Sequence, residues 1–134
     1  MRRFFLPMFL IALGLVVVHV QASADAAIVG SWKGTYDGDA QGSFSMTISQ
    51  AEDKGLSGSL TVHAEADGGG YTTAFKAVVQ DGTTFRMAYD QPDSPGTEVQ
   101  LVGTLDGTKF QGTWKVVAPG GSTDSTGTFT CSKQ

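Results

Sequence analysis

Residues 103–114 read GTLDGTKFQGTW, in which a glycine is twice followed by threonine and then by a large apolar residue. The same phrase, with Ser or Thr in the middle, occurs as GSW 30–32, GTY 34–36, GSF 42–44, GSL 58–60 and GTF 127–129. In a strand, successive side chains face opposite sides, so the bulky residue faces the core while the Ser or Thr faces water. Glycine within a strand permits the sharp coiling that a small closed sheet needs. The phrase therefore indicates the bent strands of a barrel.

Alternation of apolar and polar residues predicts strands throughout the chain after residue 24. FSMTIS at 44–49 alternates without a fault, which is typical of a half-buried strand. No stretch shows the i, i+3, i+4 apolar spacing of an amphipathic helix over three turns. The pattern predicts eight strands, at roughly 28–36, 43–50, 56–64, 71–80, 83–89, 98–105, 108–117 and 126–132.

The connections between these strands predict a meander. QDGT at 80–83 and LDGT at 105–108 place Asp-Gly between alternating runs, which favours type I′ hairpins with positive φ at both residues. AEDKG at 51–55 is also of hairpin length. Consecutive hairpins without a crossover predict an all-β, eight-stranded, antiparallel up-and-down meander that forms a closed or nearly closed barrel.

The N-terminus has the features of an export signal. Arg2 and Arg3 precede an apolar run at 4–20, and ASA at 22–24 supplies the small residues of a cleavage site. We expect residues 1–24 to be a signal peptide cleaved after Ala24, or alternatively after Ala26. A retained membrane anchor is the other interpretation, since the apolar run is near spanning length. If the signal peptide is cleaved, residues 25–134 form one periplasmic or secreted domain with no membrane anchor.

The composition of this domain narrows its function. Once Arg2 and Arg3 are set aside, the domain has thirteen acidic and seven basic residues, which gives a net charge near −6. So negative a domain lacks the basic surface that binds nucleic acid or anionic membranes, and these partners are excluded. Cys131 is the single cysteine, so no internal disulfide can form. We expect its thiol to be buried near one end of the barrel, as a small apolar group without a redox role.

Strand parity assigns each side chain to a face of the sheet. It sends His63 and the basic side chains of Lys76, Arg86, Lys109 and Lys115 outward. With no inward carboxylate or imidazole, the interior is unsuited to acid–base or nucleophilic catalysis, so we expect a protein that is not an enzyme and carries no cofactor. The expected inward residues are Trp32, Tyr36, Phe44, Met46, Ile48, Leu56, Leu60, Val62, Tyr71, Phe75, Val79, Phe85, Met87, Tyr89, Val99, Leu101, Leu105, Phe110, Trp114, Val116, Phe129 and Cys131.

One end of the expected barrel is framed by long loops, and we call this end the mouth; the other end, with short turns and both chain termini, is the base. The mouth carries seven acidic residues and the three tyrosines, which favours a binding site for a small hydrophobic ligand, neutral or cationic, because the acidic rim repels anions. Alternatively, the tyrosines merely cap the core. The acidic residues are Asp37, Asp39, Glu65, Asp67, Asp90, Asp93 and Asp124, and the expected ligand-binding residues are Tyr36, Phe44, Tyr71, Tyr89 and Trp114.

GSW at 30–32, on the first expected strand, resembles the Gly-x-Trp opening of the calycins, the group that contains lipocalins, fatty-acid-binding proteins and avidins. The wider rhythm is similar to small exported bacterial lipocalin-like domains. The resemblance covers essentially all of residues 25–134 and implies structural roles for Gly30 and Trp32, with Trp32 plugging the base. Typical lipocalins place a late Arg across this Trp and add a C-terminal helix, whereas here only Lys133 is near.

A second resemblance implies a different function. Small periplasmic inhibitors of metalloproteases are also eight-stranded barrels with Gly-x-Trp, so a protein-binding module with a filled core is the alternative. A further pattern, DGDAQG at 37–42, matches the first half of a calcium loop, but its twelfth position is Ile48 instead of Glu. We therefore expect a plain turn there and no metal site.

Overall fold

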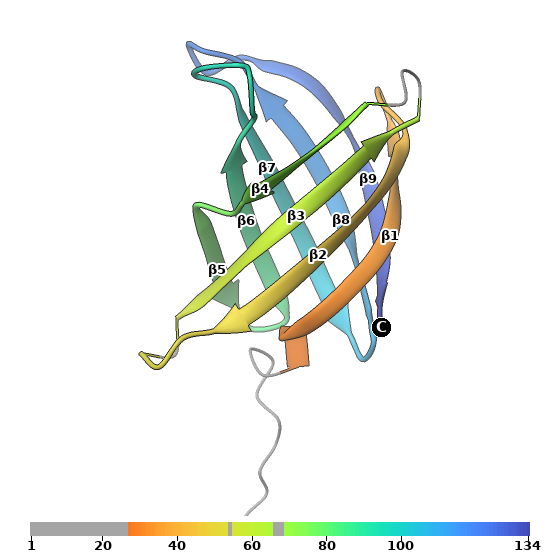
Figure 1. The fold of residues 1–134 in the computed structure, drawn as a ribbon, viewed down its shortest axis with the longest axis vertical. Helices are drawn as coiled ribbons and strands as arrows, with labels where there is room; N and C mark the ends of the chain where they lie inside the picture. Colours follow the sequence, from red (N-terminus) through yellow and green to blue (C-terminus); the bar gives the residue numbers. More distant parts are fainter. Residues whose placement is uncertain (1–26, 54, 66–68) are drawn as a thin grey trace, which may run out of the picture.

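The computed structural model describes residues 27–53, 55–65 and 69–134, and most of them lie in nine strands of one antiparallel sheet (Figure 1). A helical turn at Ala27 and Ile28 precedes the first strand. The expected signal peptide and its cleavage site lie outside the described residues. The strands are β1 Gly30–Gly38, β2 Gly42–Gln50, β3 Leu56–Ala64, β4 Gly70–Ala74, β5 Ala77–Asp81, β6 Thr84–Asp90, β7 Glu98–Asp106, β8 Lys109–Val117 and β9 Thr123–Lys133.

The up-and-down all-β architecture is confirmed, but the number of strands and the closure are corrected. The strand order is β4-β3-β2-β1-β9-β8-β7-β6-β5, so the first and last strands of the chain pair and the sheet ends at β4 and β5. The sheet curls through 248° into an open half-barrel instead of closing. Two strands that are consecutive in the chain therefore form the two free edges, and the gap between them is called the seam below.

The seam arises because the expected strand at 71–80 breaks in two. The amide of Phe75 donates to the Gly58 carbonyl on β3 at 2.9 Å, and the next amide, of Lys76, donates to the Ala88 carbonyl on β6 at 2.8 Å. The chain thus leaves one edge of the sheet and joins the opposite edge within two residues. Because β4 belongs to one edge and β5 to the other, backbone hydrogen bonds cannot close the barrel along its full height.

This break also corrects one expected core residue. Phe75 is buried, and the next half-buried apolar residue is Val78, three positions later instead of two. Val79, which we expected to face inward, is 54% exposed. A shift of one residue moves every following side chain to the other face of a strand. The strand β6 begins after a new turn, and its inward residues follow the expected alternation again.

The two Asp-Gly turns are tight hairpins, but their geometry differs from the type I′ expectation. Gly82 and Gly107 have φ of 67° and 65°, whereas neither preceding aspartate has a positive φ. Asp81 pairs with Thr84, and Asp106 pairs with Lys109, so each aspartate ends a strand and each glycine is the first central residue. Glycine at that position is the signature of a type II′ turn. Only glycine takes the left-handed conformation readily, so the turn shifts by one residue to place it there.

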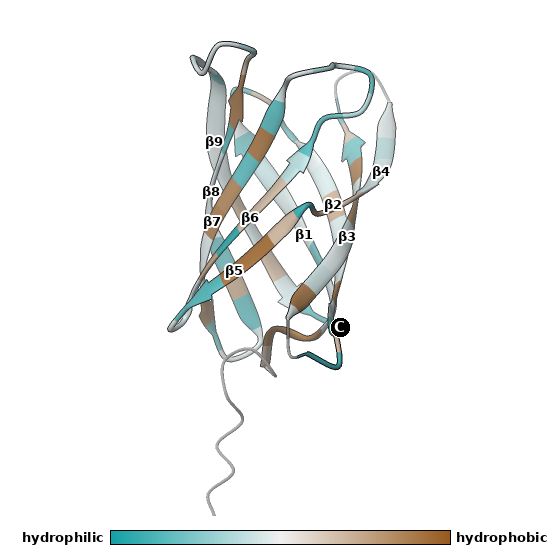
Figure 2. Ribbon diagram, turned by 90° about the vertical axis from the view of Figure 1, so that its left-hand side faces the viewer, coloured by the Kyte–Doolittle hydropathy of each residue, from teal (hydrophilic) through white to brown (hydrophobic). Residues whose placement is uncertain are grey.

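The base of the half-barrel is filled by aromatic side chains. Trp32, Phe85 and Phe110 are fully buried, and the Phe110 ring lies 6.1 Å from Trp32 and 5.9 Å from Phe85, centroid to centroid. Cys131 is buried beside them, as expected. Brown and teal residues alternate along β7 in Figure 2, which is the inward–outward pattern that places Val99, Leu101 and Leu105 in the core. Within the described residues, no helix has the length and apolarity needed to cross a membrane.

Candidate ligand-binding cavity

A cavity of about 310 Å³ lies inside the half-barrel on the mouth side of this core. All five expected ligand-binding residues, Tyr36, Phe44, Tyr71, Tyr89 and Trp114, line it, so the structure brings them together. The volume is at the lower end of the range for small-molecule sites. The other lining residues are Ala40, Leu60, Val62, Ala64, Gln91, Val99, Leu101, Val116, Asp124, Ser125 and Phe129.

Aromatic and aliphatic side chains form most of the cavity wall. Phe44 meets Phe129 edge-on at 6.0 Å, and Tyr36 meets Trp114 edge-on at 6.1 Å. The indole N–H of Trp114 donates to the carbonyls of Asp37 and Thr128, both at 3.1 Å. Because these carbonyls already satisfy its polar atom, Trp114 offers a ligand mainly apolar surface.

Two tyrosines meet across the seam inside this cavity. Tyr71 on β4 and Tyr89 on β6 come from strands that do not pair, and their hydroxyl oxygens lie 2.7 Å apart. Tyr89 is 3% exposed, and its ring also meets Phe75 edge-on at 6.1 Å. Burial raises the pKa of both phenols above the ordinary value, so both stay protonated at neutral pH. The pair therefore ties the seam from within and supplies hydroxyls to the cavity.

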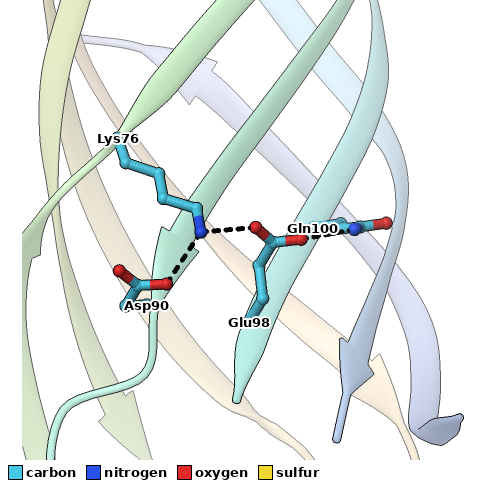
Figure 3. Close-up of polar contacts among 4 residues, drawn as sticks. All are labelled: Lys76, Asp90, Glu98 and Gln100. Carbon is cyan, nitrogen blue, oxygen red and sulfur yellow. Dashed lines mark hydrogen bonds and ion pairs between the residues drawn. The ribbon is translucent and has the colours of Figure 1, made fainter. Parts of the chain in front are cut away.

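A cluster of polar and charged residues lies on the outer surface beside the same seam, on the side of β6 and β7 (Figure 3). Lys76, between β4 and β5, reaches Asp90 at 2.8 Å and Glu98 at 2.6 Å, and Gln100 donates to Glu98 at 2.5 Å. The bond from Gln100 and the ammonium of Lys76 lower the pKa of Glu98. The side chains of Lys76 and Asp90 are 45% and 73% exposed and that of Glu98 is 28% exposed, so water screens the ion pairs and each contributes little stability. Their role is to bring β6, β7 and the β4–β5 junction together.

The rim of the cavity is acidic, as expected, but the cavity interior is not. Asp124 is the one carboxylate among the described lining residues, and it is exposed. Asp39 accepts a hydrogen bond from the Thr126 amide at 2.9 Å, which ties the β1–β2 loop to β9. No group of three or more possible metal ligands occurs within the described part of the chain. Asp67 lies outside the described residues.

Outward side chains lie where strand parity placed them. His63, Lys76, Arg86, Lys109 and Lys115 are all exposed. The described cavity lining therefore contains no imidazole or amine, and its polar groups are hydroxyls, one amide and the carboxylate at the rim. Such a set can orient a ligand through hydrogen bonds, since apolar pockets commonly use a few placed polar groups in this way.

Gly30 and Trp32 lie at the base, away from the cavity. They take part in the contacts that join the two ends of the described chain. The indole N–H of Trp32 donates to the Ile28 carbonyl at 2.9 Å. The Lys133 ammonium lies 5.9 Å from the Trp32 ring centroid and donates to the Ala27 carbonyl at 2.9 Å. A β-carbon at Gly30 would come within 2.7 Å of the Lys133 Cε, so glycine makes room for the lysine stem.

Sequence reasoning missed two parts of these sites. Ile28, fully buried at the base, was not among the expected inward residues, and it lies in a helical turn before β1 instead of in the expected strand at 28–36. Gln91 and Ala40 join the cavity from loops, and Ser125 joins it from the part of β9 that precedes the expected strand at 126–132, so strand parity made no prediction for these three residues. The parity pattern did place Val99, Leu101 and Val116 inward, but it did not show how deep along the barrel each would lie.

Comparison with known proteins supports the fold alone. No family model and no curated protein matches the chain. Among solved structures, the chain is similar to the crystal structure of Rv2717c from M. tuberculosis, with a TM-score of 0.56 and 12% sequence identity, over 81% of this chain and 94% of that one. At this identity the likeness extends to the arrangement of strands and carries no statement about ligands.

Proposed function

We propose that this chain is an exported binding protein that takes a small hydrophobic ligand, neutral or cationic, into the mouth of its half-barrel. The observation that carries the proposal is the 310 Å³ cavity lined by Tyr36, Phe44, Tyr71, Tyr89 and Trp114. A core that served only to hold the fold together would be filled at the mouth as it is at the base, because protein interiors pack closely and large voids are costly.

The charge of the rim supports the choice of ligand. Asp37, Asp39, Glu65 and Asp93 are exposed near the mouth, in addition to Asp124, whereas Asp90 is paired with Lys76. The negative charges at the entrance repel an anion and attract a cation, and both effects weaken as salt is added. A neutral or cationic hydrophobe therefore meets less resistance at the entrance than a carboxylate does.

A charge series tests the proposal. Benzyl alcohol, benzylamine and benzoate have similar size and differ in charge, and Trp114 reports on the cavity through its fluorescence. We expect the alcohol and the amine to change this fluorescence at concentrations at which benzoate does not, with benzoate at least about tenfold weaker at low salt. The Trp114→Phe variant is the control, because the remaining Trp32 is fully buried at the base and should not respond.

Native mass spectrometry of the protein purified from the cells that produce it is the complementary measurement. A co-purifying mass on the folded chain supports the proposal and identifies the ligand. A ligand-free spectrum, together with no response to any of the three probes, would contradict it. That result would favour the alternative of a protein-binding module similar to the metalloprotease inhibitors.

A further inference from the structure

The hydrogen bond between Tyr71 and Tyr89 leaves one hydroxyl proton unused. Two phenols carry two protons, and the 2.7 Å contact between their oxygens uses one of them. Within the described residues, neither hydroxyl makes another hydrogen bond. Both residues line the cavity, and Tyr89 is 3% exposed. Tyr71 is half-buried, so the pair offers one spare hydroxyl donor to the cavity, and a ligand that carries a hydrogen-bond acceptor would satisfy it.

Charge decides which acceptor suits the pair. The one carboxylate of the described lining, Asp124, is exposed at the rim, so a cation deep in the cavity would have no buried counter-charge. Burial raises the pKa of both phenols, so no phenolate forms at neutral pH to pair with a cation. An anion would have to pass the acidic rim. A neutral ligand with an oxygen acceptor needs no counter-charge in the cavity and is not repelled by the acidic rim.

Size adds a second restriction. At about 30 Å³ for each water-sized group, a cavity of 310 Å³ holds about ten non-hydrogen atoms. The wall is mostly aromatic and aliphatic, and the aromatic rings of Phe44, Trp114 and Phe129 favour a flat or cyclic hydrocarbon body.

We infer that the ligand is an uncharged, mainly hydrocarbon molecule of about ten non-hydrogen atoms whose carbonyl or ether oxygen accepts a hydrogen bond from the Tyr71–Tyr89 pair. This inference rests on the proposed function and narrows it. The proposed function admits cations and pure hydrocarbons, whereas the hydroxyl pair selects for an oxygen acceptor.

The test compares two ligands of the same shape. Acetophenone carries a carbonyl oxygen, and α-methylstyrene has a CH₂ group in its place. Their dissociation constants are measured by protein-observed NMR titration for the protein purified after expression of the full chain and for the Tyr71→Phe/Tyr89→Phe variant. We expect the variant to bind acetophenone about tenfold more weakly while its affinity for α-methylstyrene changes less than about twofold.

The ratio of the acetophenone affinity to the α-methylstyrene affinity, compared between wild type and variant, distinguishes hydrogen bonding to the ligand from a purely structural role of the tyrosines. If the tyrosines only hold the seam together, their replacement will weaken both ligands in parallel, and that result would overturn the inference. Thr72→Val is the matched control, because it removes a hydroxyl of β4 that contacts the Thr61 hydroxyl at 3.0 Å outside the cavity lining, and it should leave the ratio unchanged. Binding of 1-phenylethylamine in preference to acetophenone would also overturn the inference while leaving the proposed function intact.

A measurement on the unaltered protein keeps the inference testable if the double variant does not fold. The carbonyl stretch of ¹³C-labelled acetophenone moves to lower frequency when the oxygen accepts a hydrogen bond. We expect this shift on binding, relative to acetophenone in a hydrocarbon solvent. An unshifted band for the bound ligand would overturn the inference. A complete failure of all three ligands to bind would contradict the proposed function itself.

Discussion

At Gly112 a β-carbon would lie 1.9 Å from the Val102 carbonyl oxygen and 2.5 Å from the Cα of Gly103. The same holds at Gly127, where a β-carbon would meet the Asp37 carbonyl oxygen at 1.9 Å and the Trp114 ring at 2.5 Å. Neither glycine has a positive φ. Their role is therefore space, because neighbouring strands coil so closely that an inward β-carbon would strike the next backbone. The repeated Gly-Ser/Thr-apolar phrase marks these close approaches.

A substitution tests this explanation of the phrase. Gly112→Ala should lower the free energy of unfolding by about 1–3 kcal/mol, because the added methyl group cannot avoid a backbone carbonyl. Gly55→Ala is the matched control: its nearest neighbour is the Asp53 carboxylate, which can turn away, and its φ is not positive. Urea unfolding measures both variants. An equal loss of unfolding free energy in the two variants would show that the lack of room for a β-carbon is not the reason for glycine at position 112.

The thiol of Cys131 gives a prediction on pH. Burial raises its pKa to about 12 from the ordinary value of 9.0, so the folded state holds the proton more tightly than the unfolded state. Its contribution to stability is therefore complete below pH 9 and is lost as the pH rises from about 9 to 12. In urea unfolding, wild type should lose more stability over this range than Cys131→Ala. Parallel pH profiles would contradict the prediction.

At the scale of the element, the division of the expected strand at 71–80 decides both the shape of the sheet and the position of the cavity. Phe75 and Lys76 bond to opposite edges, and near the mouth, beyond the end of β5 at Ala77, the seam separates β4 from β6. Side chains then replace backbone hydrogen bonds, with the Tyr71 and Tyr89 hydroxyls in contact across the seam inside the half-barrel. The tyrosines that hold the edges together are thereby brought into the cavity.

Two neighbouring valines test the change of parity at this break. Val78→Thr should lower the free energy of unfolding by about 1 kcal/mol, because Val78 packs against the core and threonine places a hydroxyl there. Val79→Thr should change it by less than about 0.5 kcal/mol, because Val79 is 54% exposed. Both are measured by urea unfolding. The uninterrupted strand of the original expectation predicts the opposite order, so a larger loss at Val79 would support that pattern instead.

At the scale of the whole molecule, the half-barrel divides into a solid base and a hollow mouth. Aromatic packing and the pairing of β1 with β9 hold the base, where the two ends of the described chain meet. Lys133 joins them by lying over Trp32 and bonding to Ala27. The long acidic loops and the cavity lie at the opposite end. The residues of the base therefore stabilise the fold without lining the cavity, whereas residues such as Phe44, Trp114 and Phe129 belong to both the core and the cavity wall.

Lys133→Ala tests this division. It removes a cation–π contact and a charge-assisted hydrogen bond, so we expect a loss of about 1–2 kcal/mol in the free energy of unfolding. Affinity for a cavity ligand such as acetophenone should stay within about twofold of wild type when measured well below the unfolding transition. Lys109→Ala, at an exposed lysine on β8, is the control. A Lys133→Ala protein of normal stability but weakened binding would contradict the division.

The sequence by itself determined the fold class and the face of nearly every side chain, because alternation is a local property of a strand. It placed all five expected aromatic residues in one cavity, since loop lengths told the mouth from the base. It also located both hairpins. Only the structure showed that Gly82 and Gly107 take a positive φ while the aspartates before them do not.

Only the tertiary structure decided how the sheet ends. The break at Phe75 and Lys76 depends on two carbonyls, of Gly58 and Ala88, that belong to strands distant in the sequence. The contact between the Tyr71 and Tyr89 hydroxyls and the position of Lys133 over Trp32 depend in the same way on distant segments. Local patterns carry no information on such pairs, because the edges that meet are set by the curl of the whole sheet.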